Sequence, residues 1–591
     1  EFNMEMEKKN LAIIILAVVL AASGVGNIIL AAELGLIEVT PPKMEQSIVM
    51  GTIAGPTDMD PELCYDTAGG QVINQICEGF YKFDVTDPAY PLIPILATTL
   101  PVVGGTAEKP TLTFTLRQGV NFQDGTPFNA DAAAWKFNRL MHFMNYSGNQ
   151  YLPAPFNVPV PPTLIISKLY ALFMLDYDGN GIDEPVINHT EVLSTYSLRL
   201  HLNYPKASFI SLLNFHATYF HSPTSAQAQG KELEYLTYAD EDVLIGTGPF
   251  KFQNYFTDIQ VKFTKNYNYW RTPSPKLDNI TFWIIEDDIA LCTAVLAGDI
   301  DIFLAPRPEF FDQFRADPDI TLLEAGPTLN NLYMGFNGVM VNTTFRKAIS
   351  YAVNYSYIIN QIYTGIGLPT GGPIPTGIPM SNHSFNKAVF DRAYAQSVMQ
   401  SMGFGVGFTT NQQWLDVADA GGWAGTEDWN ITAQTEGTLR RDAALYMSDN
   451  LRYIGIDAPV VQIPFGSIIA CMVSAKRQIP MYILGWAPDY IDPENYITPL
   501  YSNTSALWVE TYDYDLEVLM RAGETTVDLV ARQAIYNEIQ RSLVEELYFF
   551  VWILVGINYD VYQDYVKDWV PNAIARTEFY EPEIGLNVYL K

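Results

Sequence analysis

The sequence predicts an α/β protein, because strand-like and helix-like stretches alternate over most of its 591 residues. Residues 111–116 alternate between apolar and polar side chains as a half-buried strand does, and Asn129 then caps a helix. Residues 280–284 repeat this pattern and are followed by a helix over residues 289–297 that ends at Gly298. No repeat of roughly 20–50 residues is present, which argues against solenoids and propellers.

The second half of the chain continues the alternation and adds long loops. Every fourth residue from Ile535 to Leu547 is apolar, which predicts one buried helix face, and the apolar run 548–555 predicts a strand covered on both faces. Residues 365–379 are rich in Gly and Pro and predict a loop. The Gly-rich residues 403–430 predict an irregular, exposed insertion.

Composition and charge narrow the class of function. The net charge of −31 argues against nucleic acid as a partner, because phosphate binding needs clustered Lys and Arg. Hydrophobic residues make up 48% of the chain, which is enough for more than one folded core. Aromatic residues reach 13%, which indicates surfaces or clefts that are rich in rings.

The first 35 residues predict a signal peptide or an N-terminal membrane anchor. Lys8 and Lys9 precede the uncharged run 11–32, which is long enough to span a bilayer, since spanning takes about 20 apolar residues. No cysteine follows this run, so a lipoprotein anchor is not expected. We expect a retained anchor, with its basic end inside and the bulk of the chain at the cell surface.

Cysteines and glycosylation sequons fit an extracytoplasmic protein without a zinc or redox centre. The four cysteines form no CxxC pair, and a helix expected over residues 67–80 would hold Cys64 and Cys77 too far apart to bridge, so free thiols are expected. Sequons that predict a glycoprotein occur at Asn145, Asn188, Asn279, Asn342, Asn354, Asn382, Asn430 and Asn503.

Catalytic signatures are missing from the sequence. It contains no GxSxG, HExxH, P-loop or GxGxxG motif, and the six histidines show no ligand spacing. An enzyme is therefore not expected, and no cofactor is required.

One segment matches the start of a calcium-binding loop. Oxygen side chains stand at positions 1, 3 and 5, a glycine (Gly181) at position 6 and a carboxylate at position 9. Position 12 is Ile187 rather than Glu, so a complete EF-hand is absent. The alternative is an acidic turn between two strands. The expected ligands of a structural Ca²⁺ are Asp176, Asp178, Asn180, Ile182 and Glu184.

A Trp-Ala-Pro-Asp segment predicts a ligand site. A strand over residues 482–484 leads directly into Trp486 and Asp489, and strand ends in open α/β sheets face the ligand crevice. Trp486 offers a flat apolar wall, and the carboxylate of Asp489 can pair with a cationic group once water is excluded. A turn with a structural Asp-Pro is the alternative.

From residue 45 to the end, the chain resembles the extracellular solute-binding proteins of family 5, the oligopeptide, dipeptide and nickel class of ABC importers. Each block that carries the resemblance is weak alone, but their common order is specific. The blocks include Thr57–Pro61, Tyr65–Ala68, Glu78–Phe80, Leu116–Pro127, Gly246–Phe250, Asn266–Trp270, Leu296–Asp301, Asn337, Arg346–Ala348 and Trp486–Asn495.

The resemblance implies a two-lobed, periplasmic-binding-protein type II-like (cluster C) fold with an extra subdomain in the first lobe. By analogy, residues 45–80, 195–322 and 550–591 form lobe I, residues 81–194 form the extra subdomain, and residues 323–549 form lobe II. The hinge is expected where the chain crosses between the lobes, near residues 325–328 and 551–557.

The resemblance also implies a site. Asp489 matches the aspartate that pairs with a peptide's α-ammonium, Trp486 walls a side-chain pocket, and the backbone of Gly485 and of Tyr65, Asp66 and Thr67 flanks the ligand. The expected partners are a short peptide and the permease subunits of an ABC transporter.

Departures from the family pattern keep alternatives open. An arginine near the ligand's far end in some oligopeptide binders is Ile483 here, and Arg477 cannot be assigned to that role. An oligosaccharide receptor of the same fold, or a surface structural protein that uses this scaffold, remains an alternative.

Overall fold

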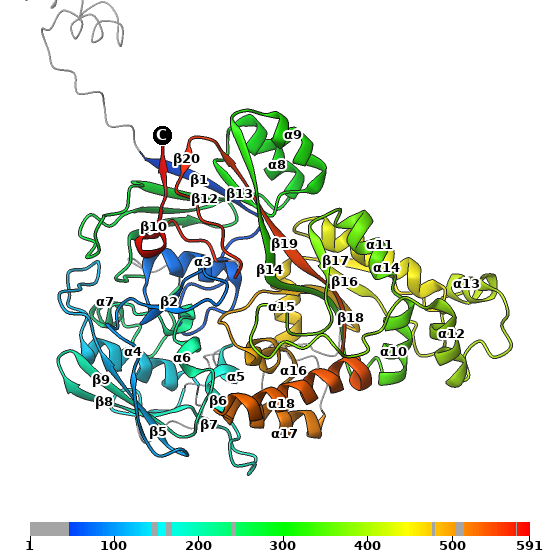
Figure 1. The fold of residues 1–591 in the computed structure, drawn as a ribbon, viewed down its shortest axis with the longest axis horizontal. Coiled ribbons are helices and arrows are strands. Elements are labelled where there is room, and N and C mark those ends of the chain that lie inside the picture. Colours follow the sequence, from blue (N-terminus) through cyan, green and yellow to red (C-terminus); the bar gives the residue numbers. More distant parts are fainter. Residues whose placement is uncertain are drawn as a thin grey trace, which may run out of the picture. The chain divides into compact units, whose positions relative to one another are not determined.

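The strands expected at residues 280–284 and 548–555 belong to one sheet of eleven strands in the computed structural model of the chain (Figure 1). The order across the sheet is β10 (Phe250–Phe256), β11 (Gln260–Lys265), β12 (Asn279–Ile284), β1 (Ser47–Thr52), β13 (Ile302–Leu304), β19 (Phe550–Gln563), β14 (Ile320–Phe336), β18 (Met481–Trp486), β16 (Ile431–Gln434) and β17 (Val460–Ile463), and β15 (Gly367–Pro369) pairs with β19 beside this path.

The structure describes residues 46–144, 152–160, 168–237, 244–474, 479–502, 513–574 and 576–591. The predicted signal or anchor segment, the sequons Asn145 and Asn503, and Arg477 lie outside these residues. Within the described part, no helix is both long and apolar enough to span a bilayer.

Strands β14 and β19 join the two halves of the large sheet. They pair with each other in antiparallel fashion. Strands β10, β11, β12, β1 and β13 lie to one side of the pair, and β18, β16 and β17 lie to the other. Their register shifts between Glu324 and Gly326 and again between Pro327 and Asn331. Gly326 has a φ of 90°, a left-handed conformation that glycine adopts without a steric penalty. The expected crossovers near residues 325–328 and 551–557 fall within these two strands.

A second sheet lies beside the first half. It consists of β4 (Val102–Gly105), β5 (Pro110–Thr115), β9 (Ser197–Leu202) and β8 (Ile187–Ser194), in that order. The expected strand at 111–116 is β5, and the following helix is α4 (Ala130–His142). Asn129 caps α4 because its side chain accepts a hydrogen bond from the backbone N–H of Ala132 at 2.9 Å.

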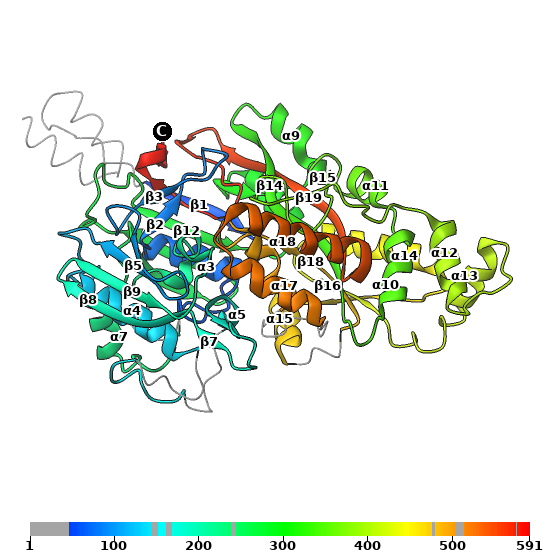
Figure 2. The same cartoon turned by 60° about the horizontal axis from the view of Figure 1, so that its bottom comes forward.

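Helices cover both halves, as the views in Figures 1 and 2 show. Asp287 caps α8, which ends at Gly298 with a φ of 76°, as expected from the sequence. The larger helices are α3 (Thr67–Ile76), α4, α8 (Asp288–Ala297), α10 (Thr343–Ala352), α12 (Arg392–Ser401), α13 (Asn411–Asp419), α14 (Leu439–Arg452), α15 (Phe465–Ser474), α17 (Tyr514–Thr525) and α18 (Leu529–Arg541).

Buried side chains lie on both faces of β14 and β18. One face carries Tyr333, Leu484 and Trp486, which belong to a core shared with the second sheet and with α17 and α18. The opposite face carries Ile483 and Met334, which pack with apolar residues of α10, α12 and α14. Ile483 is therefore a core residue that points away from Trp486.

Two sequence expectations need correction. The segment 403–430 is not wholly irregular, because α13 lies within it, and the side chains of Thr410 and Gln413 form a capping box at its start. The helix expected over residues 67–80 ends earlier, at Ile76, with Cys77 in an extended conformation. Cys64, Cys77, Cys292 and Cys471 are free thiols in the structure.

Candidate functional site

The two segments singled out by the sequence reach the same place from different parts of the fold. Strand β18 ends at Trp486, which lies opposite Asn331 of β14. Helix α3 begins at Thr67, and the side chain of Asp66 caps it by accepting the N–H of Gly69 at 2.7 Å. The end of a strand and the start of a helix therefore form two walls of one site.

A cavity of about 110 Å³ lies between these walls. This is several times the space that one buried water needs, so the cavity can admit a small organic group. All six residues expected to flank a ligand line it: Tyr65, Asp66, Thr67, Gly485, Trp486 and Asp489. The structure therefore brings together residues that are more than 400 positions apart in the sequence.

Asp489 is a half-buried acid whose carboxylate forms no ion pair among the described residues. Its carboxylate accepts the side-chain amide of Asn495 at 2.9 Å, and Asn495 in turn accepts the N–H of Asp489 at 2.8 Å. Among the described residues, no basic side chain lies within ion-pair distance of this carboxylate. Burial raises the pKa of Asp489 to about 6, although Asn495, Arg576 and Tyr65 each lower it.

Trp486 and Tyr65 form an aromatic wall. Their ring centroids are 6.2 Å apart in an edge-to-face arrangement, and Tyr65 contacts Phe215 in the same way at 6.0 Å. The indole N–H of Trp486 is buried and has no hydrogen-bond acceptor among the residues that the structure describes. The wall therefore combines a large apolar surface with polar atoms, such as this N–H, that a ligand could pair with.

Gly485 cannot carry a side chain without a local shift. A Cβ atom built on it would lie 2.9 Å from a guanidinium nitrogen of Arg440 and 3.1 Å from the carbonyl oxygen of Asn331. The backbone of Gly485 lines the cavity, whereas Arg440 occupies the space that a side chain at this position would need.

Asp66 has a structural role as the N-cap of α3. Besides the N–H of Gly69, its carboxylate accepts the hydroxyl of Thr57 at 2.6 Å. Both hydrogen bonds lower its pKa, but burial outweighs them and raises it. The side chain that fixes the start of the helix thus also sets the path of the backbone from Tyr65 to Thr67.

Several cavity residues were not found by the sequence analysis. They come from segments without a recognisable motif: Phe215, His216, Tyr333, Phe465, Ile574 and Arg576. Burial lowers the pKa of His216 to about 3, so this imidazole is neutral at physiological pH. Nε2 of His216 lies 3.1 Å from the carbonyl oxygen of Cys64.

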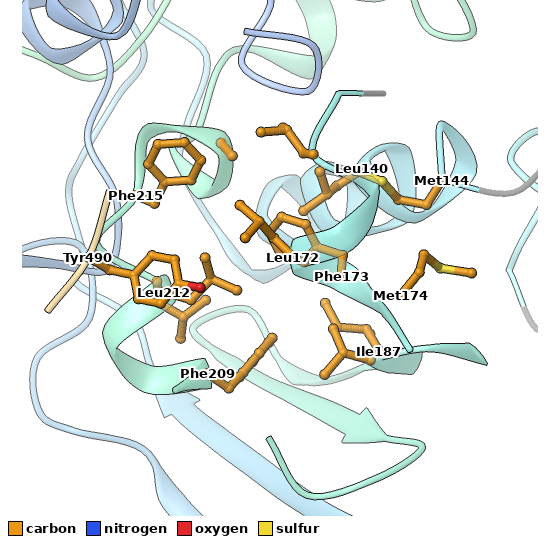
Figure 3. Close-up of a cluster of buried hydrophobic side chains, with 14 of the residues drawn as sticks. Leu140, Met144, Leu172, Phe173, Met174, Ile187, Phe209, Leu212, Phe215 and Tyr490 are labelled. Carbon is orange, nitrogen blue, oxygen red and sulfur yellow. The ribbon is translucent and has the colours of Figure 1, made fainter. Parts of the chain in front are cut away.

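The segment after Asp489 is inserted into the core that also contains the cavity residue Phe215. Figure 3 shows the ring of Tyr490 beside Leu212, in the cluster that also contains Phe209 and Phe215. Tyr490 is 0% exposed, and Ser211 donates a hydrogen bond to the carbonyl of Ile491 at 3.0 Å. These contacts hold the Asp489 backbone against the wall that carries Phe215.

The proposed calcium loop is the turn between β6 (Met174–Leu175) and β7 (Glu184–Pro185), which is the alternative that the sequence left open. Asp178 accepts the backbone N–H of Asn180 at 3.1 Å and its side-chain amide at 3.0 Å. Asp176 accepts a hydrogen bond from Arg521 at 3.3 Å. Among the described residues, no three acidic, His or Cys side chains are placed to share a metal ion. As placed, these residues do not fit calcium.

Comparison with known proteins identifies the family. The model of bacterial extracellular solute-binding proteins, family 5 (middle region), matches residues 92–508. Di/tripeptide-binding protein 1 of Pseudomonas aeruginosa is 25% identical over 496 residues, which cover 80% of this chain and 83% of that protein. Heme-binding protein A of Haemophilus influenzae is 26% identical over 476 residues, which cover 78% and 77%.

A solved structure has the same fold. The dipeptide-binding protein of Pseudoalteromonas sp. SM9913, in complex with Met-Leu, matches with a TM-score of 0.75 and 20% identity, covering 92% of this chain and 100% of that chain. The two-lobed α/β fold expected from the sequence is thereby confirmed. With a family match over more than half of its length, the chain is a member of the extracellular solute-binding proteins of family 5.

Proposed function

We propose that the protein is an extracytoplasmic receptor that captures short peptides between its two lobes and delivers them to the permease of an ABC transporter. The observation that carries this proposal is the Asp489 carboxylate, which lines the cavity, is largely removed from water and forms no ion pair among the described residues. A buried acid without a counter-ion is costly, and a ligand's ammonium group removes that cost. The peptide-binding relative and the Met-Leu complex point to the same ligand class.

The remaining walls suit a ligand whose side chains vary. The exposed backbone at Gly485 and at Tyr65–Thr67 can hydrogen-bond a peptide main chain, which every peptide shares. The aromatic surfaces of Trp486 and Tyr65 accept apolar side chains of different shapes. Affinity would thus come from groups common to all peptides, while the acid fixes the register.

The proposal extends to the lobes and the membrane. Closure would occur about β14 and β19, with the lobe boundaries expected from the sequence, and the closed form would be the one that the permease recognises. Residues 11–32 would hold the receptor at the cell surface, and the sequons would carry glycans there.

Identification of the ligand that co-purifies with the protein tests this proposal. Native mass spectrometry, followed by release and sequencing of the ligand, is expected to give short peptides with free N-termini. Calorimetry with synthetic dipeptides to pentapeptides should then show binding to protein from which that ligand has been removed. Recovery of a carbohydrate, with no heat from any peptide, would contradict it.

An oligosaccharide ligand is the second candidate, and it is favoured by the indole N–H of Trp486, which has no acceptor among the described residues and lies beside the ring of Tyr65. The two candidates differ in which substitution is severe. Replacing Trp486 by alanine should abolish binding of a sugar that stacks on this ring, whereas a peptide should retain its ion pair with Asp489 and lose less affinity. Calorimetry with both ligand classes on this variant separates them.

Calcium binding by the 176–184 turn is proposed on the sequence motif alone, and the carboxylates would have to leave their present partners. If calcium binds there, a chelator should lower the melting temperature of the wild type, and Asp178→Asn should remove that effect. An unchanged melting temperature with and without the chelator would contradict the proposal. Differential scanning calorimetry provides the measurement.

A further inference from the structure

Arg576 connects the two sides of the ligand cavity. It lies in the C-terminal segment that precedes β21 (Tyr580–Glu581) and lines the cavity. One guanidinium nitrogen donates to the carbonyl oxygen of Asn214 at 2.8 Å, and the other donates to the carbonyl oxygen of Asp489. By the expected boundaries, Asn214 and Arg576 belong to lobe I and Asp489 belongs to lobe II.

The Asn214 end of this bridge is well supported. With its side-chain amide turned so that both groups are satisfied, the Asn214 side-chain oxygen also accepts from Arg576 at 2.9 Å, while its nitrogen donates to the carbonyl of Tyr81 at 3.0 Å. Arg576 is therefore held by both the main chain and the side chain of Asn214, in addition to its hydrogen bond to Asp489.

The guanidinium of Arg576 forms no ion pair among the described residues. Among the described residues, no Asp or Glu side chain forms an ion pair with it, and its hydrogen bonds go to neutral oxygen atoms. The carboxylate that feels this charge is Asp489, whose pKa Arg576 lowers. A fixed positive charge beside the acid opposes the effect of burial, which favours the neutral form.

We propose that Arg576 is a positioning residue of the ligand site. It donates a hydrogen bond to the Asp489 carbonyl from the opposite lobe, and when the lobes are closed it keeps the carboxylate of Asp489 anionic and directed into the cavity. The bridge spans the lobes, so it exists only in the closed form. Closure thus prepares Asp489 for a cationic group. The ligand named in this inference rests on the proposed function, whereas the effect of Arg576 on Asp489 does not.

One other group near Asp489 titrates between pH 6 and 8, because burial raises the pKa of Glu494 to about 7, and this response is common to the wild type and both Arg576 variants. Tyr65 and Tyr496 have pKa values raised well above the ordinary tyrosine value, because both are buried. His216 is neutral because burial lowers its pKa to about 3. The remaining acid in the cavity wall is Asp66, which is engaged as the cap of α3. Asp489→Asn removes the response of Asp489 and leaves that of Asp66, so it is the matched control.

The experiment compares Arg576→Gln with Arg576→Lys. In Arg576→Gln, the pH midpoint for loss of dipeptide affinity should move up by about one unit, which leaves affinity nearly unchanged at pH 8 and about fivefold weaker at pH 6. Arg576→Lys retains the charge and should restore the wild-type profile. Calorimetry from pH 5.5 to 8.5 with a dipeptide that lacks charged side chains gives both curves.

A residue that is merely structural would behave differently. In Arg576→Gln, equal weakening of dipeptide affinity at every pH, or an unshifted pH midpoint, would overturn the proposal. If Arg576→Gln does not fold, a shifted midpoint in Arg576→Lys would overturn it instead. The carboxyl of Asp489 can also be titrated by carbon-13 NMR without ligand, where Arg576→Gln should raise its pKa. That titration still decides the role of Arg576 if the wild type binds no peptide, a result that would reject only the proposed function.

Discussion

Replacing Asp489 by asparagine is expected to weaken the binding of peptides with free N-termini by roughly 2–5 kcal/mol, because the ligand's ammonium group would enter a buried site without its counter-charge. Asparagine has nearly the same shape, so the cavity should persist. Calorimetry at pH 7.5 with one dipeptide on both proteins gives the difference directly. An affinity within twofold of the wild type would remove Asp489 from this role.

The same substitution should not destabilise the ligand-free protein. Burial raises the pKa of Asp489 from 3.8 to about 6, which corresponds to a cost of about 3 kcal/mol for holding the charged form at neutral pH. Because the folded-state pKa is raised, Asp489 favours folding at low pH, and this contribution is lost as the pH rises through about 6. Chemical denaturation should therefore find Asp489→Asn as stable as the wild type, or more so, at pH 7.5.

Binding and stability respond to pH in opposite ways at this residue. Protonation of Asp489 favours the folded, ligand-free protein, whereas the ligand's ammonium requires the carboxylate. Peptide affinity should therefore fall as the pH drops through about 6.

The second large effect is expected at Lys206. Its ammonium group is 2.5 Å from Glu494 and 2.9 Å from Glu524, and all three side chains are almost wholly buried. Lys206→Met would leave two carboxylates without a cation, at an expected cost of roughly 3–5 kcal/mol in the free energy of unfolding. Urea denaturation of both proteins at pH 8 provides the measurement.

The pH dependence of this loss distinguishes electrostatics from packing. Burial raises the pKa of Glu494 to about 7 even with Lys206 present, and removal of Lys206 raises it further. A raised folded-state pKa favours folding below it, so the deficit of Lys206→Met should shrink towards pH 5 and grow towards pH 8. The variant that also carries Glu494→Gln and Glu524→Gln should recover part of the loss. A deficit that is equal at both pH values would contradict this account.

Lys206 also belongs to the surface on which the Asp489 segment rests. Ala207 donates its N–H to the carbonyl of Glu524 at 2.8 Å, and Ser208 donates its hydroxyl to Glu494. Glu494 directly precedes Asn495, the partner of Asp489. The ion cluster therefore stabilises the packing of residues 206–208 against the segment that carries Asp489 and Asn495.

Part of the site could be predicted from the sequence because it follows directly from a strand. The apolar run that ends in Trp486 indicates where β18 stops, and Asp489 lies three residues later, so both belong to one edge of the sheet. Tyr65, Asp66 and Thr67 were placed by the resemblance, and the cap at Asp66 agrees with a helix that starts at Thr67.

The rest of the site depends on contacts that no local pattern records. Arg576 lies in a segment without a motif, and only tertiary packing brings it to Asp489 and Asn214. The calcium prediction could not take such a contact into account either, because Arg521 of α17, far away in the sequence, donates a hydrogen bond to Asp176. Helix α13 could have been found, because Thr410 and Gln413 have the spacing of a capping box, but the neighbouring glycines favoured a loop.

The central claim is that a buried acid at the lobe interface holds the positively charged end of a peptide, and a change in the ligand alone tests it most directly. Calorimetry at pH 7.5 should compare one dipeptide with the same dipeptide acetylated at its N-terminus. The account predicts binding of the unmodified dipeptide and at least about thirtyfold weaker binding of the acetylated one, which corresponds to the lower end, about 2 kcal/mol, of the cost of losing an ion pair. Equal affinity for the two dipeptides would contradict it.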